Sequence, residues 1–122
     1  MTARVPSAAE VAAGLRRWIR HHDPHVQAAV QLLLAHDVWL YRAEFRHACV
    51  RRNHSNGDHW IDWEAARTAF DAGTFNRAAS TERAVLDLVI AIGADHYRFS
   101  RMDTANSRAI AKAVAHALGV SR

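Results

Sequence analysis

Residues 49–63, CVRRNHSNGDHWIDW, decide how this chain of 122 residues is organised. In no other stretch does a period-two alternation of apolar and polar residues coincide with a strong turn signal. Asn56-Gly57 is the preferred pair for a two-residue type I′ turn, because both central residues need a positive φ. We therefore predict a β-hairpin over residues 49–63. A helix through Arg52 followed by an irregular loop is the alternative.

The two-residue turn also predicts how the strands pair. The expected pairs are His54 with His59, Arg52 with Ile61, Arg51 with Asp62 and Val50 with Trp63. One face then carries apolar side chains at the root and two histidines at the tip, and Trp60 lies on the opposite face. The Arg51–Asp62 pair would add a few tenths of a kcal/mol.

The rest of the chain has the apolar spacing of amphipathic helices. Start signals are Ser7 with Glu10 in capping-box spacing, Asp23-Pro24, Asp62, Ser80 or Thr81, and Asp103 or Thr104. The predicted helices span approximately residues 8–21, 24–35, 42–48, 63–72, 84–92 and 104–118. Residues 74–79 are expected to be a linker, and residues 94–102 a joint or a short third strand.

Residues 84–92, AVLDLVIAI, form the most hydrophobic segment. A helix that is apolar on nearly all sides is usually the buried central one, and its length and its Leu and Ala content favour helix over a buried strand. Its only charge, Asp87, is expected to pair with Arg83. The first, second and last helices should pack around it, the last through Ile110, Val114 and Leu118. The predicted fold is a mainly α, single-domain bundle of about five to six helices with a β-hairpin mid-chain.

Composition narrows the class of protein. Half of the residues are apolar and the formal net charge is +4. No apolar run approaches the ~20 residues of a membrane span, and the N-terminus lacks the apolar core of a signal peptide. Cys49 is the only cysteine, so no internal disulfide can form. We expect a cytoplasmic protein without a membrane partner.

Nine histidines raise the question of a metal site. His21, His22 and His25 cluster at a helix–helix turn beside Asp23, and His54 would face His59 at the hairpin tip. Zinc normally takes three or four ligands with supporting hydrogen bonds, and neither cluster supplies a closed set. We therefore expect solvated surface histidines, and we assign no metal and no cofactor.

No catalytic residue can be assigned from the sequence. Cys49 would need a base and an orienting group, and a small buried cysteine is the simpler interpretation. There is no Gly-rich phosphate loop, and Ser80, Asp87 and His96 do not have the pattern of a known triad. We predict a protein that binds rather than catalyses.

Basic residues crowd one short region. The candidate nucleic-acid contacts are Arg42, Arg46, Arg51, Arg52 and His54. Two helices, a short helix and a hairpin in that order, over about residues 7–62, resemble a winged-helix arrangement. That resemblance implies that the third helix enters the major groove while the hairpin touches phosphates. Ordinary solvation of arginines on a helical surface is the alternative.

A second function class is protein–protein interaction. The sequence has four tryptophans, and an exposed Trp flanked by Arg is typical of an interaction hot spot. The candidate partner contacts are Trp60 on the hairpin and Arg108 and Lys112, which lie on the outer stripe of the last helix together with His116. The leading prediction is a nucleic-acid-associated role, in a regulator or a nucleoprotein subunit, with a protein-interaction module as the alternative.

Overall fold

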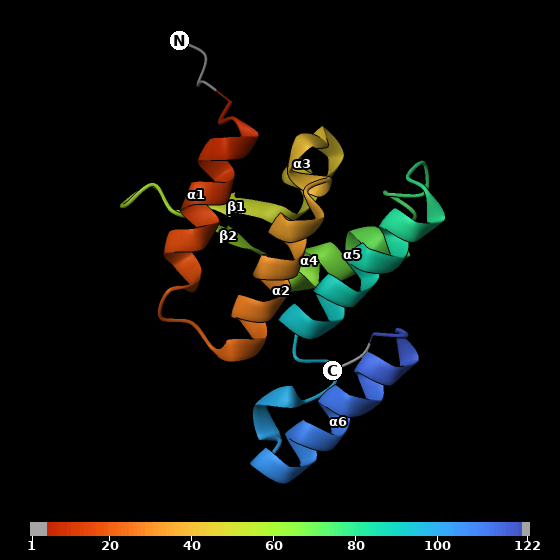
Figure 1. Ribbon diagram of the computed structural model, residues 1–122. Coiled ribbons are helices and arrows are strands. Elements are labelled where there is room, and N and C mark those ends of the chain that lie inside the picture. Colours follow the sequence, from red (N-terminus) through yellow and green to blue (C-terminus); the bar gives the residue numbers. More distant parts are fainter. Residues whose placement is uncertain (1–4, 121–122) are drawn as a thin grey trace.

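The computed structural model describes residues 5–120, and it is mainly α-helical with one two-stranded antiparallel hairpin, as predicted (Figure 1). The elements are α1 (Ala8–Ile19), α2 (Pro24–His36), the 3₁₀ turn η1 (Trp39–Tyr41), α3 (Ala43–Cys49), β1 (Val50–Arg52), β2 (His59–Ile61), α4 (Trp63–Asp71), α5 (Ser80–Gly93), the 3₁₀ turn η2 (Phe99–Arg101) and α6 (Thr104–Ala117).

Helices α1, α4 and α6 begin where a side chain satisfies one of their first backbone N–H groups, whereas Asp23 at the start of α2 makes no such side-chain hydrogen bond. The Ser7 hydroxyl accepts from the Glu10 N–H at α1, and Asp103 accepts from the Asn106 N–H at α6. Asp62 accepts from the Ala65 N–H at 3.0 Å but lies 3.8 Å from Arg51, so its capping contact is the closer of its two expected roles. At α5 the cap lies one residue before the predicted Ser80, where Glu82 accepts from the Ala79 N–H.

The packing of α2 against α5 forms the centre of the core. Val30 and Leu33 of α2 and Leu86 and Ile90 of α5 are all buried, which confirms α5 as the central helix. An aromatic cluster lies beside this pair: the Trp39 ring is 5.9 Å from Phe45 and 5.5 Å from Phe75. The spacing of apolar residues did not identify Phe75 as a core residue, because the sequence analysis placed it in a linker.

The hairpin forms, but its predicted register is wrong by two residues. Val50 pairs with Ile61, Arg51 with Trp60 and Arg52 with His59. The connection is a longer loop closed by a hydrogen bond from the Asn53 N–H to the Asp58 carbonyl, and Gly57 is its only residue with a positive φ. A shift of two residues keeps every side chain on its expected face. His59 and Ile61 therefore point inward, whereas Trp60 is exposed as predicted.

The inner face of the hairpin rests on α1. A side chain at Gly14 would place its Cβ 2.4 Å from Nδ1 of His59, so only glycine permits this approach. At the loop, Arg17 of α1 donates to the Asp58 carboxylate at 2.8 Å. Two separate contacts thus fix the hairpin against the first helix.

One further expectation about the second half is wrong. Asp87 pairs with Arg67 of α4 at 2.8 Å rather than with Arg83. Residues 94–102 form the expected joint rather than the alternative third strand: they contain the 3₁₀ turn η2, and Asp95 and Arg98 have a left-handed backbone there.

The last helix does not pack into the core, contrary to the prediction. None of its residues is buried, and the core contains no residue of α6. Figure 1 shows α6 set apart from the body, across from the end of α5. Its large apolar residues are few: only Ile110 and Val114 among fourteen, with six alanines. Such a face has too little apolar area to drive close packing.

Gly93 allows a test of the packing between α4 and α5. A Cβ at Gly93 would lie 2.5 Å from the Trp63 ring. Gly93→Ala should therefore lower the free energy of unfolding by about 1–3 kcal/mol, although alanine favours helices. Chemical denaturation measures this change. Ala84→Ser, at an exposed position of the same helix, is the control and should change little. A Gly93→Ala variant as stable as the parent would contradict the Trp63 contact.

Candidate functional site

Three of the predicted nucleic-acid contacts are engaged within the protein. Arg42 donates to the Glu82 carboxylate at 2.8 Å, and its guanidinium lies 5.1 Å from the centre of the Trp39 ring. Arg46 donates to the Pro6 carbonyl at 3.4 Å. These contacts join α3 to α5 and to the start of α1, so they support the fold.

Arg51 is also used internally. It donates to the Ala48 carbonyl at 3.2 Å and to the His47 carbonyl at 3.3 Å. Carbonyl groups at a helix C-terminus lack intrahelical partners, so Arg51 caps α3.

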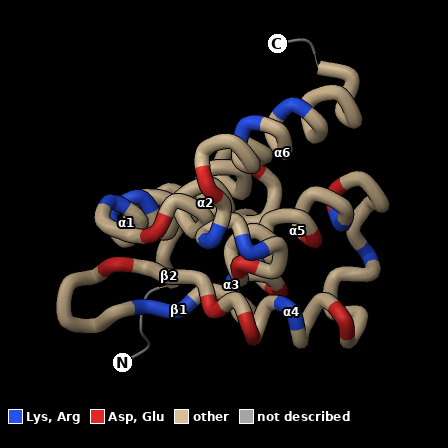
Figure 2. Tube along the Cα trace, turned by 90° about the horizontal axis from the view of Figure 1, so that it is seen from below, with Lys and Arg blue, Asp and Glu red and all other residues tan. Residues whose placement is uncertain are grey.

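Arg52 and His54 are the two predicted contacts that remain exposed. Neither side chain is in hydrogen-bond or ion-pair contact with another described residue. Figure 2 shows the basic segments of β1 on the same side of the molecule as those of α1. The structure therefore splits the predicted arginine patch into three engaged side chains and two that face outward.

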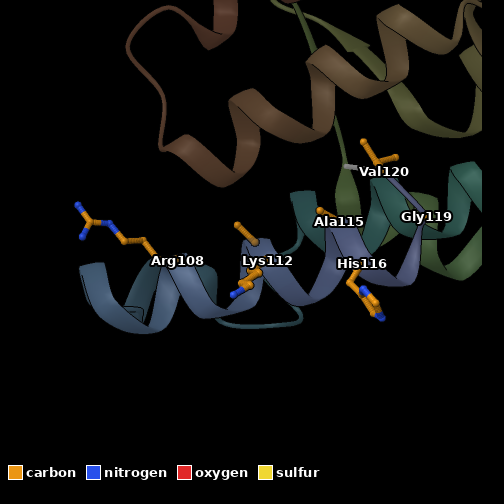
Figure 3. Close-up of a pocket in the computed structure, with 7 residues that line it drawn as sticks. Arg108, Lys112, Ala115, His116, Gly119 and Val120 are labelled. Atoms are coloured by element: carbon orange, nitrogen blue, oxygen red, sulfur yellow. The ribbon is translucent and has the colours of Figure 1, made fainter. Parts of the chain in front are cut away.

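The predicted partner contacts lie on two separate surfaces. Trp60 is 37% exposed on the outer face of the hairpin. Arg108 and Lys112 are exposed on α6, which lies well away from the hairpin (Figure 2). Figure 3 shows Lys112 and His116 pointing away from the body, whereas Ala115 and Val120 point toward it.

A large apolar groove lies between α6 and the end of α5. It has a volume of about 920 Å³, and residues 97–102 form part of its wall. Ten large apolar residues are exposed in the part of the chain that the structure describes, and seven of them line this groove. These seven are Leu88, Tyr97, Phe99, Met102, Val114, Leu118 and Val120. Exposed apolar side chains gathered in this way make the groove a candidate binding surface.

Basic residues line a hollow of α6 that adjoins the groove. Ala111 and Ala115 line the groove and also a smaller hollow, which Arg108, Lys112 and His116 line as well (Figure 3). Helix α6 contains no Asp or Glu.

The acidic residues nearest in sequence have other roles. Asp103 caps α6, and Asp95 accepts hydrogen bonds from Ser100 that lower its pKa. The available charge along this edge of the groove is therefore basic.

A second, smaller hollow lies between α1 and the hairpin. Its volume is about 380 Å³, and its lining includes Glu10, Arg17, Arg52 and His59. His59 is 6% exposed, and neither of its ring nitrogens has a hydrogen-bond partner among the described residues. The prediction that His59 is a solvated surface residue is therefore wrong.

The predicted histidine clusters do not assemble as ligand sets. His54 and His59 do not face each other, since His59 pairs with Arg52. His21 and His22 are exposed, while Nδ1 of His25 lies 3.3 Å from the Ile92 carbonyl. Within residues 5–120, no group of three or more His, Cys, Asp or Glu side chains is arranged to hold a metal ion.

Cys49 is a buried core residue, as predicted. It is 0% exposed, and burial raises the pKa of its thiol to about 12. Because the thiolate is the reactive form, this environment suppresses nucleophilic chemistry.

No family model, curated protein or solved structure matches this chain. The winged-helix resemblance thus rests on element order alone. Among the helices of residues 5–120, none has the length and apolar character needed to cross a bilayer.

Sequence reasoning missed the groove because it assigned α6 to the core. The usable signal was the composition of residues 104–117, which combine six alanines and two basic residues with no acid. A helix of this kind presents little apolar area and a single sign of charge.

Measurements of protein stability can distinguish the arginines engaged within the protein from those that are exposed. Arg42→Gln should lower the free energy of unfolding by about 1–2 kcal/mol, because it removes an ion pair and a cation–π contact. Arg52→Gln should change it by less than about 0.5 kcal/mol. Both variants remove one positive charge, so each controls for the other in denaturant titrations. Equal losses would contradict the assignment of Arg42 as a structural residue.

The accessibility of Cys49 can be tested with a coloured thiol reagent. At about pH 8, a thiol with the raised pKa is ionised in only about one molecule in ten thousand, so native protein should react very slowly. Unfolding in denaturant should make Cys49 react completely with the reagent. Ser80→Cys places a thiol at an exposed site and should react at once in the native state. Native Cys49 reacting as fast as that control would show that it is not sealed in the core.

Proposed function

We propose that this protein is a non-catalytic binding module that holds an acidic amphipathic helix of a partner protein in the groove between α5 and α6. The observation that supports it most is the concentration of seven of the ten exposed large apolar residues in that groove. An amphipathic helix lying in an apolar groove is a recurrent mode of peptide recognition, with anchors at positions i, i+3 or i+4, and i+7.

The groove has the chemistry for such a ligand. Tyr97 and Phe99, whose rings lie 5.6 Å apart, give the groove an aromatic surface, and Val114 of α6 and Leu118 just after it add aliphatic side chains to the lining. Aromatic side chains at the centre of an interface contribute much of its binding energy. Burial of these exposed side chains by a partner would remove a large apolar surface from water.

Charge favours an acidic partner over a second copy of this chain. Arg108 and Lys112 line the hollow that adjoins the groove at Ala111 and Ala115, and α6 carries no acidic residue that could pair with them from another copy. Symmetric pairing of two α6 helices would bring four positive charges together, whereas glutamates or aspartates on a partner helix would pair with them. Complementary charge of this kind mainly speeds association and selects the partner.

Nucleic-acid binding is the second candidate. It is supported by the outward-facing Arg52 and His54 and by the net charge of +4. Such binding would depend on phosphate contacts and would weaken steeply with salt. For either function, a free thiol at Cys49 suits a reducing compartment, so we propose a cytoplasmic location.

The groove proposal can be tested with a designed probe. The probe is a labelled helical peptide of about 16 residues with leucines along one face and glutamates on the other, and its counterpart carries lysines instead. Fluorescence anisotropy should show that the acidic peptide binds at least about tenfold more tightly. Val114→Asp should weaken its binding by at least about tenfold, or about 1.4 kcal/mol, because a partner would bury the new charge.

Ala113→Asp is the matched control, since it adds the same charge to an exposed position of α6 outside the groove lining. Equal losses in the two variants, or equal affinity for both peptides, would overturn the proposal. So would a concentration-dependent dimer in light scattering that Val114→Asp disrupts. Binding of generic duplex or single-stranded nucleic acid at ~50 mM salt, with no binding of the acidic peptide, would favour the second candidate.

A further inference from the structure

His59 is a buried polar side chain for which the protein supplies no partner. It is 6% exposed, and both Nδ1 and Nε2 lack hydrogen bonds to any described residue. A buried polar group without a partner destabilises the folded state, so such a group calls for an explanation. An aliphatic side chain would fill this space against Gly14 without that penalty.

The histidine lines a hollow rather than closed core. The hollow between α1 and the hairpin measures about 380 Å³, and it places His59 together with Arg52, Arg17 and Glu10. Its volume suits a small ligand or one group of a larger ligand. The hollow does not overlap the lining of the groove beside α6.

Arg52 is the cation available to a ligand in this hollow. It lies directly opposite His59 in the strand pairing, and its exposed side chain is not held by another described residue. Arg17, in contrast, is fixed by Asp58 at 2.8 Å and by the Gly57 carbonyl at 3.3 Å, so it shapes the rim.

We propose that this hollow binds a small oxyanion, a phosphate or a carboxylate group, through the ring of His59 and the guanidinium of Arg52. A guanidinium presents a planar set of donors that matches the oxygens of either group. The imidazole adds a donor at the buried end of the hollow.

Because charged groups surround His59, the titration of its ring reports directly on the binding of an anion. Burial, Arg52 and Arg17 lower the pKa of His59, while Asp58 and Glu10 act in the opposite direction. A bound anion stabilises the imidazolium, so it should raise that pKa. Binding should therefore strengthen as the pH falls toward the pKa of the complex.

The experiment is an NMR titration of the His59 ring protons against pH. It is run with inorganic phosphate, with acetate and with chloride at matched ionic strength. Phosphate should raise the pKa of His59, and chloride should not. Arg52→Gln should weaken phosphate binding at least about tenfold, or about 1.4 kcal/mol. Arg20→Gln, which removes an exposed arginine of the same charge elsewhere on the surface, should alter it less than about twofold.

Titrations with acetate and with an oligonucleotide identify which kind of molecule supplies the oxyanion. A stronger effect of acetate would assign the hollow to a carboxylate ligand. A short single-stranded oligonucleotide that binds more tightly than phosphate, with the same loss in Arg52→Gln, would assign it to nucleic-acid phosphate. An unchanged His59 titration with every anion, or equal losses in Arg52→Gln and Arg20→Gln, would overturn the proposal. Because Arg52 is exposed, its variant remains folded, and circular dichroism checks this.

Discussion

The packing of α2 against α5 is the contact on which the rest of the structure depends. Val30, Leu33, Leu86 and Ile90 meet without polar interruption. The aromatic cluster of Trp39, Phe45 and Phe75 then closes one side of this pair and brings α3 into place. Once α3 is fixed, β1 follows it directly, and the hairpin can reach back to α1. Without the packing of α2 against α5, α3 and the hairpin would have no surface to pack against.

The sequence predicted the elements well where local chemistry determines them. The apolar period identified the helices, and Ser7, Asp62 and Asp103 marked true starts because their side chains accept from N–H groups three residues ahead. The hairpin register failed for a related reason. Asn56 accepts from the Asp58 N–H through its side chain, which favours a longer loop over the expected two-residue turn. Short-range side-chain hydrogen bonds can compete with the preferred backbone conformation of a turn. The spacing of apolar residues carries no information about such hydrogen bonds.

The candidate site was harder to predict because it depends on distant partners. Whether an arginine is free or engaged is decided by residues far along the chain, such as Glu82 for Arg42, forty positions away. Likewise, the sequence placed His59 at the solvated tip of the hairpin, and only its approach to Gly14 of α1 shows that it is buried in the lining of a hollow. The groove required knowledge of which helix stays outside the core. An alanine-rich pattern has the period of a packed helix without the bulk that packing needs.

Helix α6 contributes no side chain to the core, and this separates two demands that most helices must meet together. A core helix must satisfy the interior and the outside surface with one sequence, so few of its positions are free to vary. Along α6 almost every position faces water or the groove. Single substitutions there would leave the core residues unchanged, so the exposed surface of this short segment can vary while the scaffold stays intact.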